Sequence, residues 1–538
     1  MFPHFIIENL IKNTVWIGVL FIWIVLLFPS YVRSILLRVA GLYSSILVVI
    51  LILHYELIPY SKIYIFVQII FPYMVVVDEG AYIFLGGITL LLICITWLKF
   101  KYRPKEGSKW ASFFKKRDIL SKTNNGLIIY NNKRISDKLS YQHLAVIAPT
   151  GQGKTTKFTI PNLIGMKDYS IVVTDPSGEL YQKTAGYLKS QGVNIIRLAP
   201  FDTNTTYFNP IANLKTLSQA KQLAKTILFQ MSTDGNAFWT ISAGTLLTAV
   251  ILLAVHQNKP TFETIRKSLA LSKDDLTAII DGDSTPQIQE EYSLYKNSVE
   301  VTAASILATA KAGIELFSDE HIEHVTSDHT IDFNFLRGRR TVLYLIIPED
   351  KIRYSSSFSR LFYSQLFSFS INNPKGLPIY FILEEFANIG KIPDFSEVIN
   401  VARKRNISFT MVLQDLEQVK SVYKDEAKNI LSGATVSKLF YPGLGPESAD
   451  YLSHILGKRI NQTKSKNRQS HDILENSENT RDEDKPLMSS DKIRCLPSGS
   501  AIFVTGNQAP VSIKKVIPFY DSKPLTKAVK FSEKEFYK

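Results

Sequence analysis

The chain of 538 residues is long enough for several domains, carries a formal net charge of +14 and contains only two cysteines. Two cysteines exclude a disulfide framework and a cysteine-based metal cage, which is typical of proteins that fold in a reducing compartment. Residues 1–98 hold four basic and four acidic side chains, so the whole positive excess lies downstream. That excess fits attraction to nucleic acid, attraction to anionic lipid, or a purely solubilising role.

Four uncharged apolar runs occupy the first hundred residues. The first, residues 15–32, would span about 27 Å as a helix, close to the thickness of a hydrocarbon core. A cluster of four basic residues follows the last run, between residues 99 and 105, and predicts by the positive-inside rule that the rest of the chain is cytoplasmic. We therefore expect residues 1–98 to anchor the protein in the cell (inner) membrane by two, three or four spans.

Beyond residue 100, short β-branched runs alternate with helical stretches, a pattern that predicts a parallel sheet flanked by helices. The strand-like runs are residues 144–149, 170–175, 341–348, 379–386, 407–414 and 436–442. The α/β domain is expected to comprise residues 99–213 and 333–520, and its last twenty residues read most simply as a hairpin.

Two segments depart from this alternation. Residues 214–332 are helical throughout by pattern and predict an inserted all-α domain, in which residues 238–255 are expected to form a buried helix rather than a membrane span. Residues 459–487 are rich in Lys, Asn, Ser, Asp and Glu, and predict a solvated loop or a disordered insert.

The stretch from Ala148 to Thr156 reads APTGQGKTT, follows a strand-like run and precedes an apolar segment, which is the context of a P-loop. Glycines let backbone N–H groups converge on phosphate oxygens, and the following helix adds the positive end of its dipole. Lys154 is expected to neutralise the β- and γ-phosphates of ATP, and Thr155 to place its hydroxyl on Mg²⁺. Ala148 replaces the first glycine of the strict pattern. The predicted nucleotide-binding residues are Thr150, Gly151, Gln152, Gly153, Lys154, Thr155 and Thr156.

Two carboxylates follow the apolar run YFIL, which would deliver them to the carboxyl edge of a buried strand, where open α/β sheets bind ligands. Glu384 stands where an aspartate normally assists Mg²⁺ coordination, and Glu385 is placed to activate the attacking water. Gln414 ends the next predicted strand, where its amide is expected to contact the γ-phosphate or to orient water.

The order of these motifs resembles the coupling proteins of type IV secretion and conjugation systems, the TraG-like family. The resemblance covers residues 107–520 and rests on a series of boxes in order. These are GSKWA, the P-loop with IPNLI, VVTDPSGELYQKTAG, YFNPIANL, the pair FW, LEEFANIG, ARKRNI, LQDLEQVKSVY and the closing PLM…IRCLPSG…FVTG…PV.

The resemblance implies a RecA-like P-loop ATPase that assembles as a homo-hexamer beneath the membrane, binds ATP and Mg²⁺, and delivers DNA bound to a relaxase, effector proteins, or both to the other subunits of a secretion channel. The helical insert then corresponds to the family's substrate-engaging all-alpha domain. Arg403 falls where a related coupling protein supplies an arginine to the neighbouring subunit's nucleotide, and Arg405 is its rival. The resemblance gives no role to Asp175, Lys183 or Asn209.

Two other functions fit parts of the pattern. An FtsK-like DNA translocase is expected to end in a DNA-reading module, and the residues after 520 are too few for one. An ATPase-deficient substrate adaptor fits the departures at Ala148 and Glu384, whereas Lys154, Thr155 and Glu385 favour an active enzyme. The sequence leaves open whether the cargo is DNA, protein or both.

Overall fold

The computed structural model describes residues 119–231, 237–282, 284–466 and 478–536. The chain divides into two units, residues 1–105 and 106–538, and all described residues belong to the second. The predicted membrane anchor therefore lies outside the described residues.

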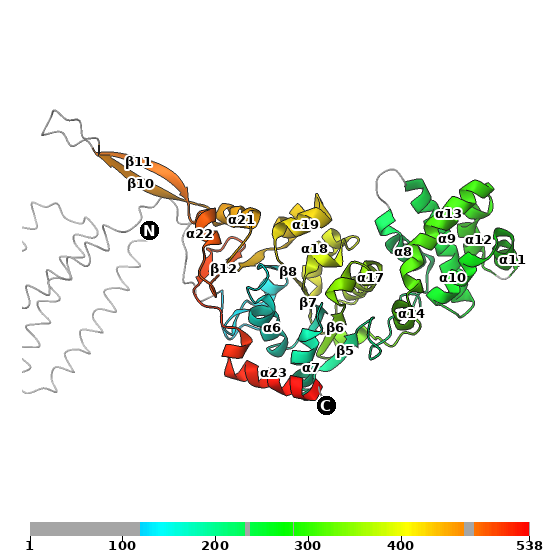
Figure 1. The fold of residues 1–538 in the computed structure, drawn as a ribbon, viewed down its shortest axis with the longest axis horizontal. Helices are drawn as coiled ribbons and strands as arrows, with labels where there is room; N and C mark the ends of the chain where they lie inside the picture. The colour runs from blue at the N-terminus through cyan, green and yellow to red at the C-terminus, as the bar shows by residue number, and fades with distance from the viewer. Residues whose placement is uncertain (1–118, 232–236, 283, 467–477, 537–538) are drawn as a thin grey trace, which may run out of the picture. The chain divides into compact units, whose positions relative to one another are not determined.

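A nine-stranded sheet forms the centre of the described unit (Figure 1). Its strand order is β13-β12-β9-β3-β8-β7-β4-β6-β5, and the seven strands from β9 to β5 run parallel. The parallel strands are β3 (Leu144–Ile147), β4 (Ser170–Asp175), β5 (Asn194–Leu198), β6 (Thr341–Ile346), β7 (Ile379–Leu383), β8 (Ile407–Leu413) and β9 (Ser437–Phe440). The six strand-like runs are all confirmed as strands. The closing hairpin is confirmed as β12 (Ala501–Thr505) and β13 (Val511–Ile513), which pair antiparallel.

Both faces of the sheet are buried because alternate side chains of each strand enter two different hydrophobic clusters. Along β4, Ile171 and Val173 belong to one cluster and Val172 to the other. The first cluster includes side chains of α6 (Ile160–Ile164), α7 (Glu179–Ser190) and α23 (Lys523–Phe536). The second includes those of α17 (Ser356–Asn372), α18 (Phe395–Ala402), α19 (Leu416–Tyr423) and α21 (Pro446–Leu456).

Strand β5 and helix α23 were not expected from the sequence. The five residues of β5 include Arg197, and an edge strand needs no continuous apolar run because only one of its neighbours is a strand. Helix α23 lies beyond the predicted domain end at residue 520. It packs on α7, where the Tyr187 N–H donates to Ser532 Oγ at 2.8 Å.

The predicted polar loop at residues 459–487 is wrong for most of its length. Strands β10 (Lys458–Lys466) and β11 (Glu478–Pro486) form an antiparallel ladder, with Lys458 opposite Pro486 and Lys466 opposite Glu478. The composition misled because such a ladder is made by backbone N–H and C=O groups, which polar residues possess as fully as apolar ones. The tip, residues 467–477, lies outside the described residues.

Residues between the strands β5 and β6 form a helical region. Its helices are α8 (Leu217–Ile227), α9 (Ala237–His256), α10 (Phe262–Ala270), α11 (Lys273–Gly282), α12 (Pro286–Lys296), α13 (Glu300–Ile314) and α14 (Glu320–Thr326). Within the described residues, Ala237–His256 and Glu300–Ser318 are long and apolar enough to cross a membrane by length and composition alone. Ten side chains of α9 are buried, and α9 packs against α8, α10, α12 and α13, which confirms the prediction of a buried helix.

The chain enters and leaves the helical region at adjacent points. The Phe208 N–H donates to Val325 O at 2.8 Å, and the Thr330 N–H donates to Tyr207 O at 3.0 Å. Asn209 fixes the entry, because its Nδ2 donates to Pro260 O at 2.7 Å and its Oδ1 accepts from the Ile211 N–H at 2.8 Å. Asn209 therefore has a structural place at the junction of the helical region with the sheet.

A buried histidine joins β8 to α18 at the amino edge of the sheet. His143 Nδ1 accepts from the Phe409 N–H at 3.0 Å, so the ring carries its proton on Nε2, which donates to Ile399 O at 2.9 Å. The bond that Nδ1 accepts needs the neutral ring. Burial, together with the charge of Arg403, lowers the pKa of His143 to about 4, against the hydrogen bond to Ile399.

We expect His143 to make stability depend on pH between about 6.5 and about 4. A depressed folded-state pKa stabilises the fold above the unfolded pKa of 6.5, and this contribution of about 3 kcal/mol is lost as pH falls towards 4. The check is to compare the free energy of unfolding of the wild type and of His143→Gln, whose amide does not titrate. Their difference should shrink on acidification, and parallel pH curves would contradict the assignment.

Candidate functional site

The P-loop connects β3 to a turn of π-helix (Thr155–Thr159) that continues into α6. Gly151 and Gly153 have φ values of +80° and +79°, a conformation that glycine adopts without strain. A Cβ atom at Gly151 would meet nothing within 4 Å, whereas one at Gly153 would lie 2.8 Å from Thr156 Oγ1. Ala148 is buried and does not lie in the left-handed region, so its position does not require glycine.

The other predicted P-loop residues surround this turn. Thr150 is exposed, and the Gln152 N–H donates to Pro149 O at 3.3 Å. Thr155 opens the helical turn and is half-buried, and Thr156 Oγ1 donates to Gly153 O at 3.2 Å. The turn therefore brings backbone N–H groups and a helix amino terminus to one place, as phosphate binding requires.

Lys154, Glu385 and Gln414 come together at the carboxyl edge of the sheet. Lys154 Nζ lies 2.7 Å from Glu385 Oε1, with the two side chains 10% and 15% exposed. Gln414 Nε2 donates to the second oxygen, Glu385 Oε2, at 3.0 Å. Glu385 itself has a φ of +49°, which is rare for a residue with a side chain and is found where function fixes the backbone.

Glu384 lies on the other side of its strand end and is buried. It accepts a hydrogen bond from Thr159 Oγ1, one helical turn after Thr155. The pKa of Glu384 is raised to about 7, chiefly by burial and also by Glu385 and Asp175, against the Thr159 hydrogen bond and the Lys154 charge. The sequence reading missed Thr159, although its spacing of four from Thr155 places both on one helix face.

Asp175, to which the resemblance assigns no role, is a second buried acid at this edge. It ends β4, and its Oδ2 accepts from the Tyr181 N–H at 2.8 Å. Burial raises the pKa of Asp175 to about 6, although backbone N–H groups oppose the shift, and its Oδ1 has no hydrogen-bond partner among the described residues. By contrast, Lys183 forms an ion pair with Glu179 on the same helix, α7, which is a structural contact.

Arg403 and Arg405 are not brought to this site within one chain. They form a turn of 3₁₀ helix before β8, and both are exposed. Gln414 follows the other end of β8, whose seven residues span roughly 20 Å at about 3.3 Å each. The P-loop lies at that same far end, because Ile147 of β3 is in register with Leu413 of β8. The Arg405 carbonyl accepts from Arg337 Nη2 at 3.0 Å, which ties the turn down.

The residues of the site fit ATP with Mg²⁺. The glycine turn and Lys154 offer donors to phosphates, and the buried carboxylates Glu384 and Asp175 lie behind them, the latter with an oxygen that has no partner among the described residues. Within the described residues no group of three or more His, Cys, Asp or Glu side chains could hold a metal ion. Mg²⁺ needs no such cage, since it is commonly bound by one or two protein oxygens, phosphates and water.

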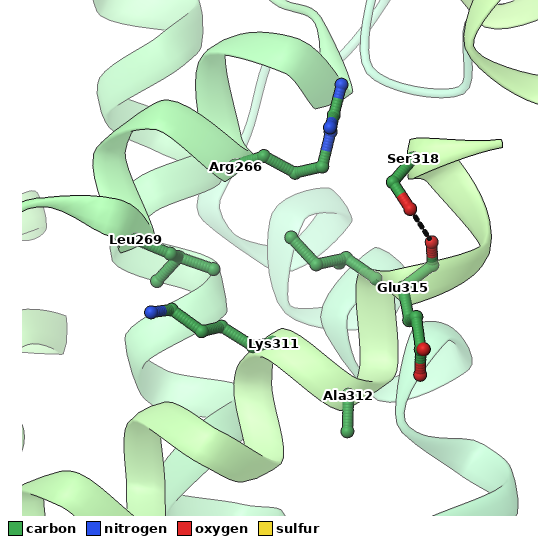
Figure 2. Close-up of a pocket in the computed structure, with 7 residues that line it drawn as sticks. Arg266, Leu269, Lys311, Ala312, Glu315 and Ser318 are labelled. Atoms are coloured by element: carbon green, nitrogen blue, oxygen red, sulfur yellow. Dashed lines mark hydrogen bonds between the residues drawn. The ribbon is translucent and has the colours of Figure 1, made fainter. Parts of the chain in front are cut away.

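A separate cavity of about 340 Å³ lies in the helical region, between α10 and the end of α13 (Figure 2). Arg266 and Lys311 stand at opposite sides of it, and Ser318 Oγ donates to Glu315 O at 2.7 Å. The lining residues are Arg266, Leu269, Lys311, Ala312, Ile314, Glu315 and Ser318. None of these belongs to the P-loop or to the acidic strand end, so this cavity is distinct from the candidate nucleotide site.

A sequence model of the family described as "Type IV secretory system Conjugative DNA transfer" matches residues 101–536. Among curated relatives, the protein VirD4 of Rhizobium rhizogenes is 23% identical over 394 residues, which is 70% of this chain and 59% of that protein. The conjugal transfer protein TraG of Escherichia coli is 24% identical over 395 residues, 66% of this chain and 62% of that protein. The chain thus spans about three fifths of these relatives.

Solved structures show the same fold. The unbound bacterial conjugative coupling protein TrwBdeltaN70 has a TM-score of 0.60 and 18% identity, covering 73% of this chain and 89% of that one. The plasmid coupling protein TrwB in complex with ADP and Mg²⁺ has a TM-score of 0.57 and 18% identity, covering 79% and 95%. The described unit therefore shares the α/β fold of these proteins, in which helices flank a largely parallel sheet.

Proposed function

The chain belongs to the family of type IV secretory system conjugative DNA transfer proteins, and from this premise we propose that it is an ATP-hydrolysing coupling protein that drives DNA, protein or both towards a secretion channel. The observation that carries the proposal is the contact of Lys154, Glu385 and Gln414 behind a glycine turn. An adaptor with a decayed site would have no need to keep a lysine, a carboxylate and an amide in mutual contact.

In the proposed reaction, the turn from Thr150 to Thr156 binds the phosphates of ATP and Lys154 neutralises them. Thr155 and Glu384 would hold Mg²⁺, which when bound would neutralise charge on the phosphates. Lys154 cannot serve the phosphates and Glu385 Oε1 equally well, so ATP binding draws it from the carboxylate. Glu385 then accepts a proton from the attacking water, and Gln414 holds that water or the γ-phosphate.

The remaining parts of the proposal rest on other features. The apolar runs in residues 1–98 support a membrane anchor at the inner membrane, with the motor on the cytoplasmic side. Arg403 lies roughly a strand length from the P-loop of its own chain, which supports a role at the nucleotide of a neighbouring subunit and hence a ring, proposed as a hexamer. The name of the matched family supports DNA as one substrate.

Glu385→Gln should still bind ATP and fail to hydrolyse it. The amide keeps the size of the side chain and its contact with Gln414 but cannot accept a proton, so we expect turnover to fall by about 10²–10⁴-fold. The measurement is steady-state ATPase activity beside binding of a fluorescent ATP analogue, in the full-length protein in detergent. Asp415→Asn is the matched control, because the Asp415 side chain caps α19 by accepting from the Glu417 N–H rather than from a residue of the site.

Glu384→Gln should behave differently from Glu385→Gln. Glu384 contacts Thr159 rather than Lys154 or Gln414, so its loss should raise the Mg²⁺ concentration needed for half-maximal activity more than it lowers the maximal rate. A Mg²⁺ titration of both variants separates the two roles. The assignment is reversed if Glu385→Gln shifts the Mg²⁺ requirement while Glu384→Gln abolishes turnover at saturating Mg²⁺.

A further inference from the structure

Strands β10 and β11 form a sheet of their own. Each has nine residues, and the two pair only with each other among the described residues (Figure 1). The base is closed where the Leu487 N–H donates to Gly457 O at 2.8 Å. A lone two-stranded ladder is marginally stable in water, and two long outer edges invite further strands.

The sequence distributes charge unequally between the two strands. Strand β10 carries four basic residues and no acidic one, whereas β11 carries four acidic residues and two basic ones. Over the whole of residues 458–486, seven basic residues oppose six acidic ones, so the hairpin is nearly neutral. DNA or an anionic lipid surface would be bound by a uniformly basic hairpin, which this is not. A hairpin with one basic and one mainly acidic strand fits a partner that also has a basic and an acidic strand, such as a second copy of itself.

We propose that the outer edge of β10 in one subunit pairs with the outer edge of β11 in the next, so that the hairpins join a ring of chains head to tail. This inference rests on the ring assembly proposed above and names one of its interfaces. Pairing β10 with β10 would set cations against cations, whereas β10 against β11 sets cations against anions. A head-to-tail contact is the kind that a ring requires, because each subunit offers one edge and receives the other.

The charges favour one antiparallel register between subunits. Lys458 opposite Asp484, Arg459 opposite Glu483 and Lys464 opposite Glu478 make three pairs of opposite charge and none of like charge. The register within the hairpin differs by two residues and gives a single opposite pair, Lys466 with Glu478, and a like pair, Arg459 with Lys485. The charges are therefore better matched between hairpins than within one. In the intermolecular register Thr463 stands opposite Asn479.

Disulfide formation between two differently marked chains tests this register. In a full-length background of Cys94→Ser and Cys495→Ser, chains with Thr463→Cys are co-expressed with chains with Asn479→Cys, and membranes are treated with a mild oxidant. Each chain has one cysteine, so any disulfide joins two chains. We expect linked dimers from the mixture and about tenfold fewer from either chain alone. Equal yields from the single chains, or none from the mixture, overturn the proposal.

Charge reversal separates contacts between hairpins from contacts within one. One variant carries Arg459→Glu and Lys464→Glu, the other Glu478→Lys and Glu483→Lys, with the cysteine markers added as before. When either variant is paired with itself, the yield of disulfide-linked dimers should fall at least about tenfold. Mixing Thr463→Cys on the β10 variant with Asn479→Cys on the β11 variant should restore it, although the β11 variant keeps like charges at the opposed positions 466 and 478 within its own hairpin. No restoration on mixing contradicts pairing between chains.

The failure of this inference is distinguishable from failure of the proposed function. ATPase activity and ring size by native mass spectrometry are measured on the same samples. If ATPase activity and rings are found without the disulfide, the proposed hairpin interface is wrong and the proposed motor function stands. If the disulfide forms without ATPase activity, the interface is supported and the proposed enzymatic function is wrong.

Discussion

Lys154→Ala should abolish ATP hydrolysis and transport while the protein still inserts and folds. The lysine reaches the site from a turn held by glycines, and its partner in the structure is a carboxylate that the proposed reaction needs free. Losing the ammonium removes a charge from the transferring phosphates, an effect that typically costs about 10²–10³ in turnover or more. Steady-state ATPase measurements and a transfer assay in cells check the result.

A second lysine provides the control for Lys154→Ala. Lys183 also lies in a family box, but it pairs with Glu179 on the surface of α7, so Lys183→Ala should keep full activity. Thermal unfolding of both variants distinguishes a lost charge at the site from a lost fold. Undiminished hydrolysis in Lys154→Ala would remove the nucleotide assignment altogether.

Arg403→Ala should nearly silence hydrolysis, by about 10³–10⁵-fold, because an arginine supplied to the transition state is worth that much. Since Arg403 and the P-loop stand at opposite ends of β8, we expect the guanidinium to act on the nucleotide of another subunit. Mixing two inactive variants then tests this role, because an arginine with only a surface role would not restore activity. Arg403→Ala subunits keep a sound P-loop, and Lys154→Ala subunits keep a sound arginine. Each is inactive alone, and mixed rings should recover part of the activity.

The neighbours of Arg403 supply its controls. Lys404→Ala changes an exposed charge in the same turn and should leave activity unchanged. Arg337 donates a hydrogen bond to the Arg405 carbonyl and so fixes the Arg405 backbone. The exposed Arg405 side chain takes no part in that bond and is the rival candidate. Full activity in Arg403→Ala with loss in Arg405→Ala would transfer the role. Mixed rings as inactive as their parts would show that the arginine does not act between subunits.

The sequence predicted the part of the fold that burial dictates. Strands β3, β4 and β6 to β9 are buried on both faces, so most of them leave a run of large apolar side chains in the sequence. Edge strand β5 and the hairpin β10–β11 leave no such run, because β5 is covered less and the β10–β11 ladder depends on backbone groups alone. Helix α23 was missed because its mostly charged surface outweighs the few side chains, such as Val529, that it buries.

The candidate site was predictable as a set of neighbours. Lys154, Glu385 and Gln414 each follow a strand of one parallel sheet, so the topology alone places them at one edge. Their contacts were not predictable. The left-handed backbone at Glu385 turns its carboxylate towards Lys154, and the longer side chain of Glu384 reaches Thr159 instead of Thr155. Both details depend on backbone angles and on depth of burial, which cannot be inferred from the spacing of residues in the sequence.

The adjacent entry and exit of the helical region, joined between Phe208 and Val325, have an evolutionary consequence. Because the two ends of this insertion are adjacent, a change in its length does not alter the separation of the strands that it connects. Its length and surface can therefore diverge while those strands keep their register. Under the proposed function, proteins of this family could change their cargo by altering residues between these two points. The helical region would then change faster than the part proposed to hydrolyse ATP.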